Sequence, residues 1–483
     1  MKSDYFRIMK KTKTERSATF KGSVLVMLSV TVILLVGVLV LKLDPYIPLM
    51  TATIPITLYG IHLGISWKEL MDNAYSSIAG CMEAAILILT IGMVVGAWIA
   101  SGTVPVLIYY GIKILSPSLV LPLSFLLTAL MSMLTGSSWT TVGTLGVAFA
   151  GIGTAMNINP ALMVSTIVGG AFFGNAQSPM ADIPVFSESI SGVESYKGSK
   201  ASVAANVPAF AISAIIYTII GFKYTSGGND VFANTQAVLD GLSNNFNLSI
   251  VTFVPAILMI ICMVIKLPGI PTRFVAFFSA LIIAIVFQGE GVKESFGYLI
   301  SGYVGNSGIE AVDNILTRGG MNGMMGTIVI MIFSMWIAGI IGRTKIVDVI
   351  LAKVSGLVKR IGLLVTTTTI CTFIFNFIAA DPFLSVSLPV KAFGKSFDEL
   401  GYDRGILCRC VNMAAYFAPM VPWGSGGIFV ATTLGVPVVE FLPYYFVGFI
   451  APIVNILLAF LGIAMPRTGA VPSSNTQLKV SNN

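Results

Sequence analysis

Charged side chains are scarce in this chain of 483 residues. Asp, Glu, Lys and Arg make up 10% of it, whereas hydrophobic residues make up 55%. Soluble globular proteins carry roughly 25% charged residues, so the composition excludes an ordinary soluble protein. The mean hydropathy is +0.90, and the apolar runs are continuous rather than alternating. They predict an all-α polytopic membrane protein and not a β-barrel.

Histidine and cysteine are also rare. His62 is the single histidine, and none of the five cysteines has metal-ligand spacing with it. The sequence therefore predicts neither a zinc site nor a histidine-dependent nucleophile. It contains no phosphate-binding loop motif, so ATP-driven transport within this chain is not expected. We predict that the protein is not an enzyme and has no cofactor.

The net charge of +7 comes from loops and from the N-terminal tail. Positive residues beside the first membrane span favour a cytoplasmic location, so we expect residues 1–21 to be a basic cytoplasmic tail. We expect the protein to lie in the inner (cytoplasmic) membrane. Such a tail also attracts anionic lipid headgroups; nucleic acid is not an expected partner. The basic residues of the tail are Lys2, Arg7, Lys10, Lys11, Lys13, Arg16 and Lys21.

Apolar runs divide the rest of the chain into two halves. We expect a first membrane repeat over 22–222, a polar linker over 223–248, a second repeat over 249–465 and a polar tail over 466–483. Because a membrane span needs about 20 residues, the two halves hold roughly 12 membrane segments, counting spans and half-spans.

The first half contains a polar stretch between Gly136 and Ser189. Irregular backbone at membrane depth is tolerated only where protein or a water-filled cavity covers it. We therefore expect a re-entrant hairpin with its tip at Gly136, followed by a discontinuous helix broken between Gly174 and Pro179. The polar candidates for a binding site in these two segments are Ser137, Ser138, Thr140, Asn175, Gln177, Ser178 and Asp182.

The second half contains a matching tip and a matching break. Interrupted apolar segments at corresponding positions of two halves indicate the binding site of a secondary transporter. The candidates here are Asn376, Asp381, Ser385 and Asn412. Because intramembrane carboxylates are usually functional, we predict that Asp182 and Asp381 ligate Na⁺. Two alternatives stay open: the hydroxyl cluster packs helices, and each aspartate caps a helix or starts a turn.

Six short motifs in these segments resemble the NhaC-type Na⁺/H⁺ antiporter family. The resemblance extends from the third span to Met465, and the motifs are WIASGTVP (98–105), GSSWTTVGTLG (136–146), FGNAQSPMAD (173–182), ADPFLS (380–385), VPWG (421–424) and TLGVP (433–437). It implies two inverted repeats with paired hairpins, a homodimer, an elevator-like movement of the site and Na⁺ as the coupling ion. The family also includes carriers similar to malate/lactate exchangers and amino-acid carriers.

The chain departs from the family pattern within the site itself. The family usually has aspartate where this chain has Asn175, and an acidic pair where it has Asn412 and Met413. An amide cannot titrate but can still ligate Na⁺, so these changes remove candidate proton carriers. Two hypotheses follow: cation-linked transport like that of a Na⁺/H⁺ antiporter, or a Na⁺-coupled carrier of a small organic anion or amino acid without obligatory proton exchange. A channel or receptor would instead show no substrate counterflow.

Overall fold

The computed structural model describes residues 15–224, 229–265, 267–356 and 358–468. Most of the basic tail, most of the C-terminal tail and residues 225–228 of the expected linker lie outside these ranges. The described chain is almost entirely helical, as predicted. Two isolated β-bridges, Tyr303 with Arg318 and Tyr402 with Arg467, are the only strand-like pairings in those ranges.

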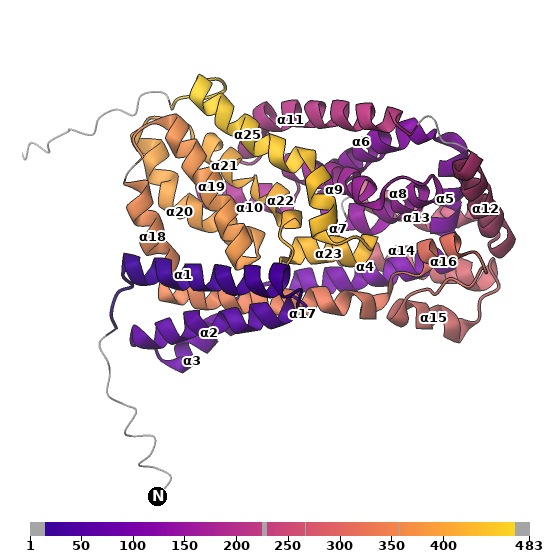
Figure 1. Ribbon diagram of the computed structural model, residues 1–483, viewed down its shortest axis with the longest axis horizontal. Helices are drawn as coiled ribbons and strands as arrows, with labels where there is room; N and C mark the ends of the chain where they lie inside the picture. The colour runs from indigo at the N-terminus through magenta and orange to yellow at the C-terminus, as the bar shows by residue number, and fades with distance from the viewer. Residues whose placement is uncertain (1–14, 225–228, 266, 357, 469–483) are drawn as a thin grey trace, which may run out of the picture.

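The first half begins with helices that form a peripheral group and continues with those that carry the polar stretch (Figure 1). In chain order they are α1 (Phe20–Leu35, extended by a π-helical turn to Val40), α2 (Tyr46–His62), α3 (Trp67–Gly80), α4 (Met82–Ala100), α5 (Thr103–Ile114), α6 (Pro117–Thr135), α7 (Ser138–Thr141, continued by a π-helical turn, Val142–Gly146), α8 (Val147–Ala155), α9 (Pro160–Gln177), α10 (Asp182–Ser191) and α11 (Lys197–Phe222). The expected linker contains a further helix, α12 (Asn229–Asn245).

The second half repeats this order of peripheral and then interrupted helices. They are α13 (Val254–Val264, preceded by a 3-10 turn, Ile250–Phe253), α14 (Gly269–Val286), α15 (Val292–Ser301), α16 (Glu310–Leu316), α17 (Gly320–Thr344), α18 (Ile346–Ser355), α19 (Ile361–Ala379), α20 (Pro382–Glu399), α21 (Arg404–Val411), α22 (Ala414–Phe417, continued by a 3-10 turn to Met420), α23 (Ser425–Leu434), α24 (Val438–Phe441, continued to Tyr444) and α25 (Phe446–Leu461).

Seven of the described helices are long and apolar enough to cross a membrane, or up to nine if each of two bent pairs is one span. The expected number of roughly 12 also counted half-spans. Several apolar segments are indeed too short for a full crossing, since α5 has 12 residues and α25 has 16. The protein is therefore a multi-pass membrane protein with short, interrupted segments between its full spans.

The two halves meet along antiparallel helices. Gly92 and Gly96 of α4 lie against the backbone of Gly320, at the start of α17. On the outside, α14 of the second half packs on α4, and α2 of the first half packs on α17. The packing of α4 and α17 on each other and on these outer helices therefore joins the two halves.

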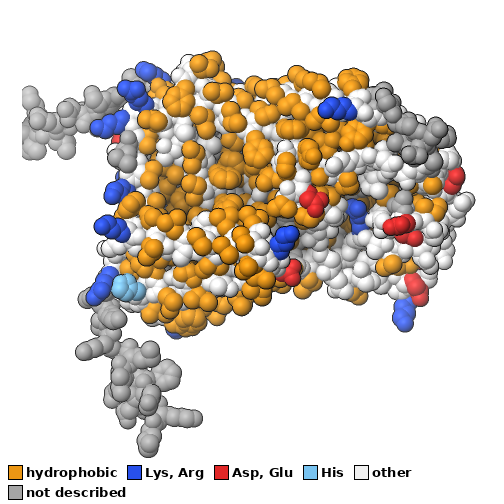
Figure 2. Space-filling model, viewed as in Figure 1, with side chains coloured by type: hydrophobic (Ala, Val, Ile, Leu, Met, Phe, Trp, Pro, Cys, Tyr) orange, Lys and Arg blue, Asp and Glu red, His pale blue; other side chains and the backbone are white. Residues whose placement is uncertain are grey.

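The visible surface is largely apolar, and its charged side chains are unevenly distributed. Figure 2 shows Lys and Arg along one end, charged side chains of both signs near the middle of the face, and mostly Asp and Glu toward the other end. Ion pairs also lie at helix ends. Arg343 contacts Glu15 at 2.6 Å and Glu69 at 3.3 Å, and Lys197 contacts Asp403 at 2.6 Å. Charged ends around an apolar belt are what a bilayer requires of a spanning protein.

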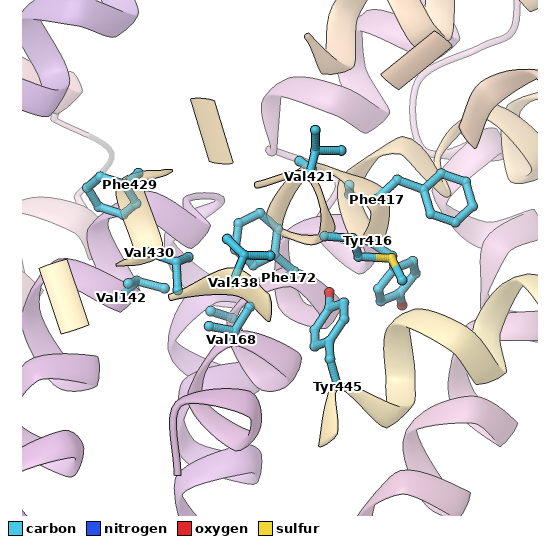
Figure 3. Packing of buried hydrophobic residues seen from close by; sticks show 14 of the residues in the cluster. Val142, Val168, Phe172, Tyr416, Phe417, Val421, Phe429, Val430, Val438 and Tyr445 are labelled. Carbon is cyan, nitrogen blue, oxygen red and sulfur yellow. The ribbon is translucent and has the colours of Figure 1, made fainter. Parts of the chain in front are cut away.

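The interior between the halves is packed with large apolar side chains. Figure 3 shows Val168 and Phe172 of α9 among residues of α22, α23 and α24. The rings of Trp139 on α7 and Phe429 on α23 have centroids 4.8 Å apart. This packing holds the polar tip of the first half against the interrupted helix of the second half.

Candidate ion and solute site

The tip after α6 and the break after α9 lie directly against each other. Gly136 ends α6 with a φ of +68°, a left-handed conformation that favours glycine. A Cβ at this position would come within 3.0 Å of the Met180 carbonyl oxygen and 3.3 Å of the Ala181 nitrogen. The helix break predicted over 174–179 is observed, shifted to the four residues between Gln177 and Asp182. Glycine is therefore what allows the tip to touch the break.

Asn175 and Asp182 connect the tip and the break through one amide group. The Asn175 Nδ2 donates to the Gly136 carbonyl oxygen at 3.4 Å and to Oδ1 of Asp182 at 3.1 Å. Asn175 is buried, whereas Asp182 is exposed at the surface of the chain. Within the described ranges, no Lys or Arg nitrogen lies within 4 Å of the Asp182 carboxylate. Three oxygen-bearing groups therefore converge on one point without a basic partner.

The hydroxyls of the tip form a second polar group next to this point. The Ser137 side chain caps α7, because its Oγ accepts from the Thr140 nitrogen at 3.2 Å. The two hydroxyl oxygens lie 2.9 Å apart. Thr140 Oγ1 also accepts from Nη2 of Arg273 at 2.6 Å. An arginine on α14 therefore reaches the tip from the other half of the chain.

Three of the other candidates have mainly structural roles. Gln177 points away from the break, since its Nε2 donates to the Ser199 carbonyl oxygen and its Oε1 accepts from Asn206 on α11. Ser178 lies inside the break, where its Oγ accepts from the Met180 nitrogen at 3.3 Å. Ser138 is buried in the first turn of α7. The structure thus brings Ser137, Thr140, Asn175 and Asp182 together and directs Gln177 elsewhere.

The second tip is built differently. Asp381 is 6% exposed, and its Oδ1 accepts from the Leu384 nitrogen at 2.8 Å as the N-cap of α20. Asn376 donates to Ser385 Oγ and to the Ala414 carbonyl oxygen, both at 3.3 Å. The capping interpretation of Asp381 describes this arrangement. Asn376, Asp381 and Ser385 share one tip, as expected.

Asn412 does not join that tip. Its Oδ1 accepts from Ser187 on α10 at 2.6 Å, and its Nδ2 donates to Ser202 on α11 at 3.3 Å. Asn412 therefore connects the second half to the restarted helix of the first half. The rings of Phe186 and Phe383, in the opening turns of α10 and α20, have centroids 5.4 Å apart. The two helices that begin at Asp182 and Asp381 meet through this ring contact.

Two buried charged residues were not among the site residues predicted from the sequence. Arg273 is 4% exposed, and Glu188 is also 4% exposed. Glu188 accepts from the nitrogens of Tyr196 and Ser199, both at 2.9 Å, and so caps the start of α11. The signal for Arg273 in the sequence is a lone arginine at the start of an apolar run.

Interrupted helices that place polar groups and backbone carbonyls inside an apolar bundle define a secondary transporter. The family described as the Na⁺/H⁺ antiporter family matches residues 16–195 and 170–463. The chain belongs to this family.

Several known antiporters are similar to this chain over most of their length. The chain is 32% identical over 456 residues to the Na⁺/H⁺ antiporter NhaC of Alkalihalophilus pseudofirmus, covering 94% of this chain and 98% of that protein. It is 31% identical to the arginine/ornithine antiporter ArcD of Halobacterium salinarum, with coverages of 93% and 94%. It is 32% identical to a malate-2H⁺/Na⁺-lactate antiporter of Bacillus subtilis, with coverages of 84% and 86%. These antiporters therefore differ in what their names say they carry.

Proposed function

We propose that this protein exchanges Na⁺ across the membrane and that Na⁺ binds between Asp182, Asn175 and the carbonyl oxygen of Gly136. The observation that carries the proposal is Asp182, a residue exposed at a helix break. Its carboxylate accepts from Asn175 Nδ2 at 3.1 Å and from the Ile183 nitrogen at 2.9 Å, and it has no basic partner within 4 Å in the described ranges. A carboxylate at membrane depth is expensive against lipid, so we infer that this face borders an aqueous pathway. Oxygen ligands suit a hard cation such as Na⁺.

The Asn175 amide marks where the ion would bind. Its Nδ2 donates both to Gly136 and to Asp182, and a cation at this point would replace those two hydrogen bonds. A rotation of the amide would present Oδ1 as a further ligand, because an amide carries one donor and one acceptor end. We assign Asp381 to the second tip as a helix cap that orders α20 and not as a direct ligand of the same ion.

A second candidate function is Na⁺-coupled carriage of a small organic anion or amino acid. Asn175 and Asn412 cannot carry protons, which weakens obligatory Na⁺/H⁺ exchange. Arg273 favours the second function because it places a buried positive charge against the hydroxyls of the tip. The arginine/ornithine and malate/lactate relatives, by their names, carry organic solutes.

Orientation and assembly extend the proposal. The Lys- and Arg-rich end in Figure 2 is the one at which α1 begins in Figure 1, so we place that end in the cytoplasm by the positive-inside rule. We also propose the inner membrane as the location, a homodimer as the assembly, and an elevator-like movement of the interrupted helices. Accessibility labelling of single cysteines introduced at Lys68 and at Glu294 tests the orientation: only the Lys68 position should be protected in sealed cells.

Na⁺ counterflow tests the function without knowledge of the second solute. Purified protein in liposomes loaded with unlabelled Na⁺ is given a trace of radioactive Na⁺ outside. We expect accumulation of label by the native chain and a loss of about 10- to 100-fold in Asp182→Asn, the usual range for removing a charged partner. Asp398→Asn is the matched control, since Asp398 pairs with the exposed Arg404. Folded native protein without counterflow would contradict the proposal, and a pH-sensitive dye inside shows whether protons move.

A further inference from the structure

Arg273 has too few partners for a buried charge. Of its guanidinium nitrogens only Nη2 has a hydrogen-bond acceptor, the Thr140 hydroxyl at 2.6 Å. Nε and Nη1 are buried without a partner. No Asp or Glu oxygen of the described chain lies within 4 Å of Arg273. Since a guanidinium stays protonated in proteins and carries five donors, most of its donors are unused.

Such an arrangement is expensive unless a partner binds. Buried charges are normally paired and hydrogen-bonded, and Arg409, the second arginine buried within the described ranges, follows that rule more closely. Arg409 is 1% exposed, and its Nη1 donates to the Ala464 carbonyl oxygen while Nη2 contacts the Met465 sulfur, so that Nε alone lacks a partner among the described residues. Arg409 satisfies groups at the end of α25, whereas Arg273 is directed at the tip that we assign to transport.

The free donors of Arg273 retain the geometry of a fork. Nη2 has two hydrogens, and Thr140 takes one of them. The second forms a parallel pair either with the hydrogen of Nε or with one on Nη1, and neither of those nitrogens has a partner. Parallel N–H pairs of this kind bind a carboxylate in a bidentate manner.

The two hydroxyls next to the fork share one hydrogen bond, and one hydroxyl hydrogen stays free whichever of them donates. Thr140 Oγ1 accepts from Arg273, so its own hydrogen is available for Ser137 Oγ at 2.9 Å. When Thr140 donates, Ser137 Oγ accepts from its hydroxyl and from the Thr140 nitrogen, and the hydrogen of Ser137 is free to donate. The arginine and a hydroxyl of the tip therefore both have hydrogens to donate to an oxyanion.

We propose that Arg273, with Thr140 and Ser137, binds the carboxylate group of a small transported solute. The proposal rests on the Na⁺ site above and names the class of solute that accompanies it. Gly136, whose carbonyl oxygen is assigned to Na⁺, adjoins Ser137 in the chain. A carboxylate on Arg273 cancels the positive charge that would otherwise repel the cation, so carboxylate and Na⁺ strengthen each other's binding.

Thermal unfolding in detergent, followed by intrinsic tryptophan fluorescence, tests this site. Native protein is titrated with sodium acetate, sodium L-lactate and sodium L-malate against sodium chloride and sodium sulfate at equal Na⁺ concentration. We expect at least one carboxylate to raise the unfolding midpoint above chloride. We expect Arg273→Gln to weaken its apparent affinity about 10- to 100-fold, the range for losing a hydrogen-bonded charge. Arg273→Lys should lose about tenfold, because an ammonium lacks the fork.

Arg409→Gln is the matched control and should bind the carboxylate like the native protein. The proposal is overturned if no carboxylate stabilises native protein that still responds to Na⁺, if only sulfate does so, or if folded Arg273→Gln and Arg273→Lys both bind within about threefold of native. Should Arg273→Gln not fold, Arg273→Lys decides alone. A carboxylate response without any Na⁺ response would sink the Na⁺ site and leave the arginine site standing, so the two failures are distinguishable.

Discussion

The two polar tips occupy corresponding places in the two halves but differ in how their polar groups are satisfied. At the first tip, Asp182 is exposed, Arg273 has two nitrogens without partners, and one Asn175 amide donates to two oxygens. At the second tip, Asp381 caps α20, and Asn376 bridges Ser385 and the Ala414 carbonyl oxygen. In the adjoining break, Trp423 Nε1 donates to the Phe377 carbonyl oxygen at 2.8 Å, whereas the buried Tyr416 hydroxyl has no partner among the described residues.

This difference indicates a division of labour. A buried polar group that is fully hydrogen-bonded stabilises one structure, whereas an unpaired one stays costly until a ligand arrives. We infer that the first tip binds the transported species and that the second tip is a rigid counterpart. The same pattern of interrupted helices therefore supports two roles, which only the partners of each side chain can separate.

Replacing each aspartate with alanine should give the largest difference in Na⁺ counterflow between the two tips. We expect Asp182→Ala to reduce Na⁺ counterflow about 100-fold, since a bare cation loses its only charged ligand at that tip. Asp381→Ala should retain measurable counterflow and instead lose about 1 kcal/mol of unfolding free energy, as loss of an N-cap usually does. Counterflow in proteoliposomes and chemical denaturation in detergent measure the two effects. Equal loss of counterflow in both variants would show that the tips share one ion site.

Restoring a carboxylate at Asn175 or at Asn412, where the family is acidic, should affect proton coupling differently at the two positions. Asn175→Asp places a second carboxylate where Nδ2 now lies 3.1 Å from Asp182 Oδ1. Two carboxylates this close do not both ionise, so a proton is held near neutral pH, and Na⁺ must displace it. We expect Na⁺ uptake to acquire proton release and to weaken severalfold as pH falls, measured with an internal pH dye.

Asn412→Asp is the matched variant for that test. Asn412 contacts Ser187 and Ser202 and not Asp182, and both serines can donate to a carboxylate. We therefore expect no new proton release from this variant. Proton release from Asn412→Asp alone would instead move the proton-coupled site to the contact between α21 and α10.

Much of the fold could be predicted from local sequence. The long apolar runs gave the spans, and proline and glycine gave the interruptions: Pro160 starts α9 under the Asn159 cap, and Gly136 ends α6. The amide and hydroxyl composition of the first tip also indicated several of the side chains that the structure places at this tip. These features depend on backbone chemistry within a few residues, which a sequence displays directly.

The partners of the site residues could not be predicted, because they come from distant segments. Arg273 and Thr140 are 133 positions apart, and Ser187 and Asn412 are 225 apart. Nothing near Asp381 distinguishes a cap from a ligand. Likewise, Gln177 resembles Asn175 in sequence, yet it points toward α11 because Asn206 and Ser199 satisfy it there.

A methyl group at the first tip should affect transport more than folding. Gly136→Ala strains a left-handed residue by about 1–2 kcal/mol and places a Cβ 3.0 Å from the Met180 carbonyl oxygen. The break must then move away from the tip, and the Asn175 bridge lengthens. We expect a drop of about tenfold in Na⁺ affinity, consistent with a loss of about 1.4 kcal/mol, read from the Na⁺ dependence of counterflow. A native Na⁺ affinity in this variant would show that Gly136 does not belong to the ion site.

The reverse exchange at the second tip should give the smallest effect. Ala380 already adopts a φ of +55°, a conformation that costs a residue with a Cβ about 1–2 kcal/mol. Ala380→Gly relieves that strain but raises the entropy of the unfolded chain, which offsets about 0.5–1 kcal/mol. We expect the unfolding free energy to rise by less than about 1 kcal/mol, with Na⁺ counterflow unchanged, in denaturant titrations beside the native protein. A loss of counterflow would mean that strain at Ala380 serves transport and that the second tip is no passive counterpart.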